Sequence, residues 1–214
     1  MLEIKRFEVN MLQENCYVVS DDTFDCMIVD CGAYFPEEIK AITNYISHME
    51  LNPVMHVLTH AHLDHLFGAH ALYEEYGLKT TLCIKDEKMY ADIPKQAEML
   101  FGMHLNHDMP PVEKFVKDGD IIKFGDSAFK VIETPGHTPG SMLIYNKEEG
   151  VAFSGDTLFK GSIGRTDLPG GSMFQIIQSL RMITQYPDDT RILPGHGPET
   201  TLGYECETNM YLDR

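Results

Sequence analysis

Four apolar runs in this chain each end in small or turn-forming residues and then present a side chain that can bind a metal ion. Loops at the ends of strands are where a rigid sheet directs functional side chains toward one point. Because the same local design recurs in four distant segments, we expect the chain to fold around one shared site. The runs, each with the side chain that follows it, are 54–59 with His60, 129–134 with His137, 151–154 with Asp156, and 192–193 with His196.

The rest of the chain alternates short apolar runs with helical segments, which is typical of an α/β protein. Helices are expected at residues 67–76 and at residues 36–49 and 173–183, where apolar side chains recur at helical spacing. Proline and glycine interrupt segment 86–111, so we expect short helices and a loop there that form a flap over a site. Strands are expected at residues 2–9, 16–20, 26–30, 54–59, 80–84, 129–134, 142–145, 151–154 and 191–193.

Length and charge restrict the class of protein. The 214 residues predict a single domain, residues 1–214, that is large enough to bury a full core. Only 17 basic residues face 33 acidic ones, which gives a net charge of −16, whereas a protein that follows a phosphate backbone needs an excess of basic residues. We therefore expect no nucleic acid partner.

No part of the sequence has the pattern of a membrane or export segment. No stretch approaches the ~18 apolar residues of a membrane-spanning helix, and the N-terminus lacks the pattern of a signal peptide. The five cysteines are odd in number and scattered, which is typical of reduced thiols in a cytoplasmic protein. We expect a cytoplasmic protein without a membrane partner, and the sequence leaves its oligomeric state open.

The densest group of possible ligands is the loop Thr59-His60-Ala61-His62-Leu63-Asp64-His65. Histidines two residues apart point the same way only where the backbone is extended, and the last histidine then needs a turn. This loop therefore differs from the helical zinc site with histidines at i and i+4. Imidazole and carboxylate suit zinc, iron, manganese or cobalt. Because no cysteine lies in any of the four loops, a closed structural zinc site is not expected.

The chain resembles the metallo-β-lactamase superfamily over nearly its whole length, and within it the small glyoxalase II-like (hydroxyacylglutathione hydrolase-like) hydrolases. The His-x-His-x-Asp-His loop carries the resemblance to the superfamily, and the other motifs carry the resemblance to the smaller group. The resemblance implies a four-layer αββα sandwich, with two mixed β-sheets face to face and helices outside. The motifs lie at residues 14–17, 29–32, 60–65, 134–140, 154–159, 194–198 and 200–205.

The resemblance also implies a binuclear metal site with one bridging carboxylate. Zinc is the expected metal, with iron or manganese as alternatives. Asp156 stands where the familiar zinc β-lactamases place a cysteine, which argues against antibiotic hydrolysis. By position, the first metal would be held by His60, His62 and His137, the second by Asp64, His65 and His196, and both by Asp156.

The expected reaction is hydrolysis of thioesters of the S-lactoylglutathione type, a small-molecule substrate. Two cations ~3.5–4 Å apart lower the pKa of a shared water toward ~7, which supplies a bridging hydroxide. Asp64 is expected to orient this hydroxide and move its proton. Arg165 is the residue expected to contact the substrate carboxylate, with a surface ion pair as the alternative. The chain ends 18 residues after His196, which leaves no room for the helical domain that holds glutathione in larger relatives, so the thiol stays open.

Three other interpretations remain. Persulfide dioxygenases share the fold, the histidine loop and a similar stretch at 164–167, and use a single iron. A two-metal phosphodiesterase is disfavoured by the acidic charge, and a non-catalytic metal-binding protein by the complete ligand set. We expect Asp30 to support a ligand loop through hydrogen bonds. His48, His56 and His70 are expected on the surface or in packing, whereas His104 and His107 lie in the irregular segment, where an approach to the substrate is the alternative to a surface position.

Overall fold

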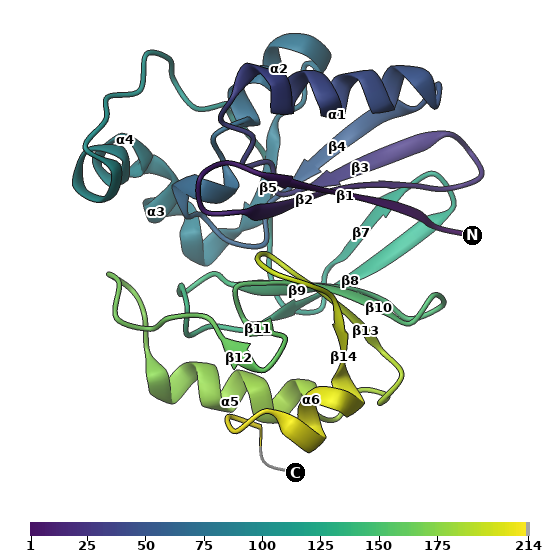
Figure 1. The fold of residues 1–214 in the computed structure, drawn as a ribbon, viewed down its shortest axis with the longest axis vertical. Coiled ribbons are helices and arrows are strands. Elements are labelled where there is room, and N and C mark those ends of the chain that lie inside the picture. The colour runs from purple at the N-terminus through teal and green to yellow at the C-terminus, as the bar shows by residue number, and fades with distance from the viewer. Residues whose placement is uncertain (213–214) are drawn as a thin grey trace.

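The computed structural model describes residues 1–212, and its first β-sheet is built from residues 3–116 (Figure 1). The first three strands of the chain pair with one another in antiparallel fashion. The three strands that follow all run parallel to the third, because helices or long loops connect them. This first sheet has the order β1 (Glu3–Val9), β2 (Glu14–Ser20), β3 (Asp25–Val29), β4 (Asn52–Val57), β5 (Thr80–Cys83) and β6 (Val112–Val116).

The second sheet comes from the C-terminal half and is antiparallel except for one parallel pair, β10 with β13. A separate hairpin of two short strands, β11 (Leu158–Phe159) and β12 (Ser162–Ile163), follows β10. The second sheet has the order β14 (Thr200–Thr201), β13 (Arg191–Pro194), β10 (Val151–Gly155), β9 (Met142–Asn146), β8 (Ser127–Glu133) and β7 (Ile121–Phe124).

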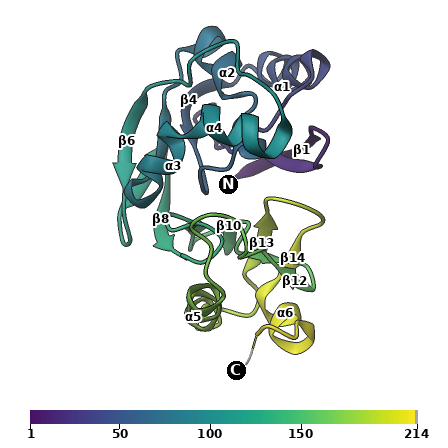
Figure 2. The same cartoon turned by 90° about the vertical axis from the view of Figure 1, so that its left-hand side faces the viewer.

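The two sheets pack face to face, and helices cover their outer faces, as Figures 1 and 2 show. α1 (Pro36–His48) and α2 (Ala69–Tyr76) cover the first sheet, and α5 (Met173–Ile183) and α6 (Leu202–Thr208) cover the second. The sequence therefore folds into the expected αββα sandwich of two mixed sheets.

The central core lies between the sheets, and its side chains come from alternate positions of the inner strands. Tyr17, Phe129 and Phe153 pack there, with ring centroids of Tyr17 and Phe153 5.2 Å apart. Every residue of β2 is buried, because one of its faces meets the second sheet and the other meets the helices. This burial on both faces explains why the apolar residues of β2 follow one another directly instead of alternating with polar ones.

The nine expected strands are present with shifted ends, and several short elements were not expected. The run 54–59 forms β4 at Asn52–Val57, because Thr59 leaves the ladder and donates its backbone N–H to the Asp30 side chain. The helix expected at 67–76 begins at Ala69. The elements that the sequence did not indicate are β6, β7, β11, β12, β14 and α6. They are short, or alternate too weakly to stand out.

Segment 86–111 forms short helices and a loop, as expected. A 3₁₀ turn (Ile84–Asp86) leads into α3 (Glu87–Ala91), α4 (Ile93–Gln96) and a π-helical turn, η3 (Ala97–Phe101). Figure 2 shows α3 and α4 at the side of the sandwich that faces the viewer. None of the helices in residues 1–212 combines the length and the apolar character needed to cross a membrane.

Candidate metal centre

The loop after β4 carries four of the seven predicted ligands, and its backbone has the shape that the sequence required. His62 has φ −90° and ψ 144°, which is extended. A 3₁₀ turn at Leu63–His65 then brings His65 round. His60 and His65 are fully buried, and their ring centroids lie 4.2 Å apart.

The other three predicted ligands follow strands of the second sheet. His137 comes after β8, Asp156 directly after β10, and His196 after β13. Since β10 and β13 are parallel neighbours, their carboxyl ends meet at the same edge. A close approach of main chain to side chain occurs here, because a Cβ atom at Gly195 would lie 2.4 Å from Asp156 Oδ1. Only glycine leaves room for that contact.

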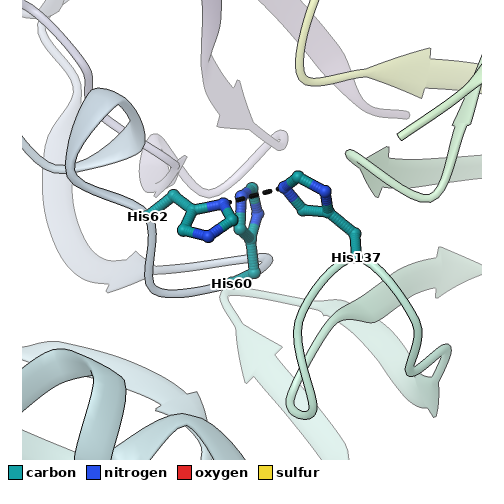
Figure 3. Close-up of side chains that lie close together, drawn as sticks. All are labelled: His60, His62 and His137. Atoms are coloured by element: carbon teal, nitrogen blue, oxygen red, sulfur yellow. Dashed lines mark hydrogen bonds between the residues drawn. The ribbon is translucent and has the colours of Figure 1, made fainter. Parts of the chain in front are cut away.

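Three of the histidines form one group, shown in Figure 3. One ligand nitrogen from each of His60, His62 and His137 lies within 4.8 Å of the others. His62 Nδ1 and His137 Nε2 are 2.8 Å apart. The rings come from two loops, one following β4 and one following β8, and they point toward one another (Figure 3). This group has the composition predicted for the first metal.

A second group lies beside the first and is more open to solvent. Ligand atoms of Asp64, His65 and His196 lie within 4.8 Å of one another. His196 Nε2 is 3.3 Å from Asp64 Oδ2, and the side chains of these two residues are 23% and 15% exposed. This group has the composition predicted for the second metal, and one side of it is open to solvent.

Asp156 lies between the two groups. Its Oδ1 is 3.4 Å from His65 Nε2, and its Oδ2 is 3.5 Å from His137 Nε2 and 3.7 Å from His196 Nε2. The carboxylate therefore faces histidines of both groups, which is the position expected of a bridging ligand.

The chemistry of these side chains fits bound cations. His60 Nε2, His65 Nε2 and Asp156 Oδ1 are buried without a hydrogen-bond partner among residues 1–212. Buried polar atoms nearly always have a hydrogen bond, so three atoms without one at a single point indicate a ligand, although His65 Nε2 and Asp156 Oδ1 also face each other as an ion pair. Burial lowers the pKa of His62 to about 4 and that of His60 well below its usual value. Both imidazoles are then neutral at pH 7, which metal binding requires.

Charges in the second group stabilise one another. Burial opposes ionisation of Asp156, but His65 outweighs it and holds the pKa of this carboxyl well below its usual value. Burial likewise disfavours a charged His65, yet Asp156, Asp30 and Asp64 raise its pKa well above the usual range. A divalent cation bound beside these carboxylates would replace the proton of His65 and leave its imidazole neutral.

The predicted supporting role of Asp30 is confirmed. Its Oδ1 accepts a hydrogen bond from Thr59 N at 2.8 Å, and its Oδ2 accepts one from Thr59 Oγ1 at 2.8 Å. His65 Nδ1 lies 3.0 Å from the same Oδ2. Glu14 stands nearby, with its Oε1 3.8 Å from His65 Nδ1, and burial raises its pKa well above the usual value.

Two buried side chains that the sequence did not single out fix the ligand loops. Asp86 accepts hydrogen bonds from Ala61 N at 3.0 Å, Thr138 Oγ1 at 2.8 Å and Gly140 N at 2.7 Å, so it joins the loop after β4 to the loop after β8. Gln96 Nε2 donates to Ala61 O at 2.9 Å. The sequence held one signal for these two residues, which is that both lie in segment 86–111, the segment expected to form a flap over a site.

The structure places Arg165 in a surface ion pair. Its Nε and Nη2 each donate to a carboxylate oxygen of Asp167 at 2.7 Å, and the side chain is 61% exposed. Its backbone carbonyl, however, lies 2.7 Å from His137 Nδ1. The contact of the guanidinium with a substrate carboxylate therefore stays a prediction. The main chain at this position, in contrast, holds the ring of the predicted metal ligand His137.

The other histidines lie outside the centre. His48 is exposed on α1, and His104 is 3.0 Å from Glu98 with a side chain that is 83% exposed. His70 and His107 stack with ring centroids 4.0 Å apart. His56 in β4 is fully buried, and both of its ring nitrogens lack a partner among the described residues.

Comparisons with known proteins agree with this fold. The family model described as the metallo-β-lactamase superfamily matches residues 9–196. Hydroxyacylglutathione hydrolase GloC of Haemophilus influenzae is 35% identical over 214 residues and 99% of each chain. The crystal structure of BLEG-1 B3 metallo-β-lactamase has a TM-score of 0.90 at 32% identity, covering 99% of this chain and 100% of that one. The structure of TTHA1623 in a di-iron-bound form has a TM-score of 0.86 at 36% identity, covering 97% and 100%.

Proposed function

Because the chain belongs to the metallo-β-lactamase superfamily, we propose that it is a hydrolase of thioesters that uses two divalent cations, with zinc as the native metal. The observation that carries the proposal is the set of two ligand groups that face Asp156 from either side. The likeness to hydroxyacylglutathione hydrolase GloC supports a thioester substrate. We place the activity in the cytoplasm, where buried free thiols such as Cys16 and Cys31 remain reduced.

When bound, two cations would lower the pKa of water toward ~7 and withdraw electrons from the substrate carbonyl. The protein's part is to hold its ligand nitrogens and carboxylates in fixed directions. Contacts at Nδ1 leave Nε2 of His65, His137 and His196 facing the centre.

Asp64 is the side chain that we propose to orient the attacking water and accept its proton. Burial opposes its ionisation, but His65 and His196 lower its pKa, so its carboxylate is charged at neutral pH. Its partial exposure places it at the open side of the centre, within reach of both water and substrate. The thiol that leaves needs little help from an acid, because thiols ionise with a pKa near ~8.5.

The proposal is tested in two ways. Elemental analysis of the purified chain gives its metal content, and release of free thiol measures hydrolysis of a panel of thioesters. We expect close to two metal atoms per chain and thiol release that stops after chelation and returns with zinc. One iron atom per chain with oxygen consumption on a persulfide would instead establish the dioxygenase alternative. The di-iron form of TTHA1623 makes iron-loaded protein a necessary arm of this panel.

A second candidate function is hydrolysis of β-lactams, which the likeness to BLEG-1 B3 metallo-β-lactamase favours. The carboxylate of Asp156, at the position where the familiar zinc β-lactamases have cysteine, argues for the thioester. A chromogenic cephalosporin in the same panel separates the two. Rapid ring opening without thioester cleavage would replace the thioesterase proposal.

A further inference from the structure

We propose that a cavity beside His62 binds an unbranched apolar carbon chain of the thioester, about four to six carbons long; this inference rests on the proposed function. The cavity measures about 150 Å³, and His62 forms part of its wall. Most of the remaining wall is apolar, formed by Met89, Met99, Leu100, Leu168 and Pro169.

The wall is made by two segments that meet next to the metal centre. Met89 belongs to α3, and Met99 and Leu100 belong to the π-helical turn η3. Leu168 and Pro169 belong to the loop that follows β12. The two segments lie close together, since a Cβ atom built at Gly170 would lie 3.7 Å from Met89 Sδ.

The cavity is fixed relative to the ligand histidines. Gln96, which also lines it, is 8% exposed and reaches the main chain on both sides of His62. Its Nε2 donates to Ala61 O at 2.9 Å, and its Oε1 accepts from Leu63 N at 3.3 Å. A chain bound in the cavity would therefore stand at a constant distance from the reacting centre, which is what orientation of a scissile bond requires.

The lining matches an aliphatic chain better than a multiply charged group. Met99 and Leu100 are 56% and 41% exposed, and an apolar ligand would cover them. Methionine side chains adapt to flexible apolar ligands. Lys95 and Asp92 are the charged residues of the lining and balance each other. The guanidinium of Arg165 is already bound to Asp167.

The volume sets the length of the chain. An apolar cavity of about 150 Å³ holds a benzene molecule, which has six carbons. Each methylene buried from water contributes ~0.8 kcal/mol, which corresponds to about a fourfold change in kcat/KM. The gain must end once the cavity is full. We therefore expect kcat/KM to rise about fourfold per methylene and to level off near six carbons.

The kinetic test has two arms, because the chain can lie on either side of the scissile bond. One arm lengthens the acyl group from two to ten carbons on the neutral thiol N-acetylcysteamine, and the other lengthens an alkanethiol that carries an acetyl group. A rise and plateau in one arm assigns the cavity to that side of the bond. Equal rates along both series, with thioesters still hydrolysed, would overturn the cavity proposal and leave the proposed function standing.

A matched pair of variants tests the lining itself. Met99→Gln keeps the size and flexibility of the side chain but adds a polar group, and we expect the gain per methylene to fall from about fourfold to about twofold. Met173→Gln makes the same change at a methionine that is 51% exposed and lies outside the lining, and it should keep the full gain. An equal gain in kcat/KM per methylene in both variants would contradict the proposal that Met99 lines the site for the carbon chain.

A binding readout separates this proposal from the proposed function. Neutral hexanamide is titrated into protein with ¹³C-labelled methionine methyl groups. We expect the signals of Met89 and Met99 to shift and that of Met173 to stay. No shift up to the highest soluble concentration of hexanamide would overturn the cavity as a binding site. Shifts without any thioester hydrolysis would support a site for apolar chains and overturn the proposed function instead.

Discussion

The two sheets supply the metal centre in different ways. The first sheet places four ligands in one loop, residues 60–65, and buried side chains behind that loop hold its shape, above all Asp30 and Asp86. The second sheet places one ligand at each of three strand ends. There the main chain holds the rings, since His137 contacts Arg165 O and His196 contacts Leu12 O.

This difference determines how each half responds to change. A loop held by buried polar side chains depends on their charge and hydrogen bonds, and therefore on single substitutions and on pH. A ligand held by a backbone carbonyl has no side chain behind it that a substitution can remove. We therefore expect removal of a side chain behind the ligands to act strongly in the first half and weakly in the second, where only a change that moves the main chain should act strongly.

The largest effect is expected where the halves meet, at Asp156. Asp156→Asn removes the negative charge that faces His65, His137 and His196. Thioester hydrolysis should fall by more than the ~10–100-fold that losing a partner behind a metal ligand costs. Metal content should fall below two atoms per chain, as measured by elemental analysis. Asp126→Asn, an exposed position in the β7–β8 turn, is the control and should keep both. Two metal atoms per chain and full activity in Asp156→Asn would show that the Asp156 carboxylate is not needed as a ligand shared by the two halves.

The next effect concerns acid stability of the first sheet and comes from His56 in β4. Burial lowers the pKa of His56 to about 4 from 6.5, so the unfolded chain binds a proton that the folded chain refuses between these values. Stability from this residue is complete above pH 6.5 and is lost as pH falls toward 4, by up to ~3 kcal/mol. His56→Leu should therefore flatten the decline of the free energy of unfolding between pH 6.5 and 4, measured by urea denaturation.

A matched substitution checks that the effect belongs to burial. His48→Leu removes an exposed histidine from α1 and should leave the pH dependence of stability as in the wild type. An unchanged acid slope in His56→Leu would mean that buried charge does not set the pH response of this half.

A smaller loss is expected from Asp30→Asn. Asn keeps the left-handed backbone at this position, where φ is 52°, because Asn tolerates that conformation better than most residues. It removes the carboxylate that faces His65 Nδ1 and Thr59 Oγ1. Metal affinity or activity should fall ~10–100-fold, measured by competition with a chelator and by kcat/KM. Asp25→Asn removes a carboxylate bonded to Asn52 at the other end of β3 and should leave both unchanged.

The same difference between the halves decides what the sequence could predict. The loop 60–65 packs four ligands into six residues, so local spacing alone indicated a metal site there. His137, Asp156 and His196 are isolated in the sequence, and their grouping needed the four strand-end runs and the family resemblance. The αββα layers followed from that resemblance, because the order of strands alone does not determine how two sheets pair.

What the sequence could not predict depends on long-range hydrogen bonds. Asp86 bonds to Gly140, 54 positions away, and Gln96 bonds to Ala61, 35 positions away. No local pattern distinguishes these two side chains from other polar residues of segment 86–111. The edge strands β6 and β7 were missed for a different reason. In β6 the exposed Glu113 and Lys114 interrupt the apolar pattern, and β7 has only four residues.

The smallest effect is expected at Arg165, and it tests the main-chain half most directly. Arg165→Ala removes an exposed ion pair but keeps the carbonyl that lies 2.7 Å from His137 Nδ1. Metal content and kcat/KM should stay close to wild type. Gly164→Ala is the opposite case, because its Cβ would lie 1.8 Å from Asp156 O and the main chain must move. That variant should lose metal. An increase in KM of roughly tenfold or more in Arg165→Ala, the size of a lost charged hydrogen bond, would show instead that the guanidinium leaves Asp167 to bind the substrate.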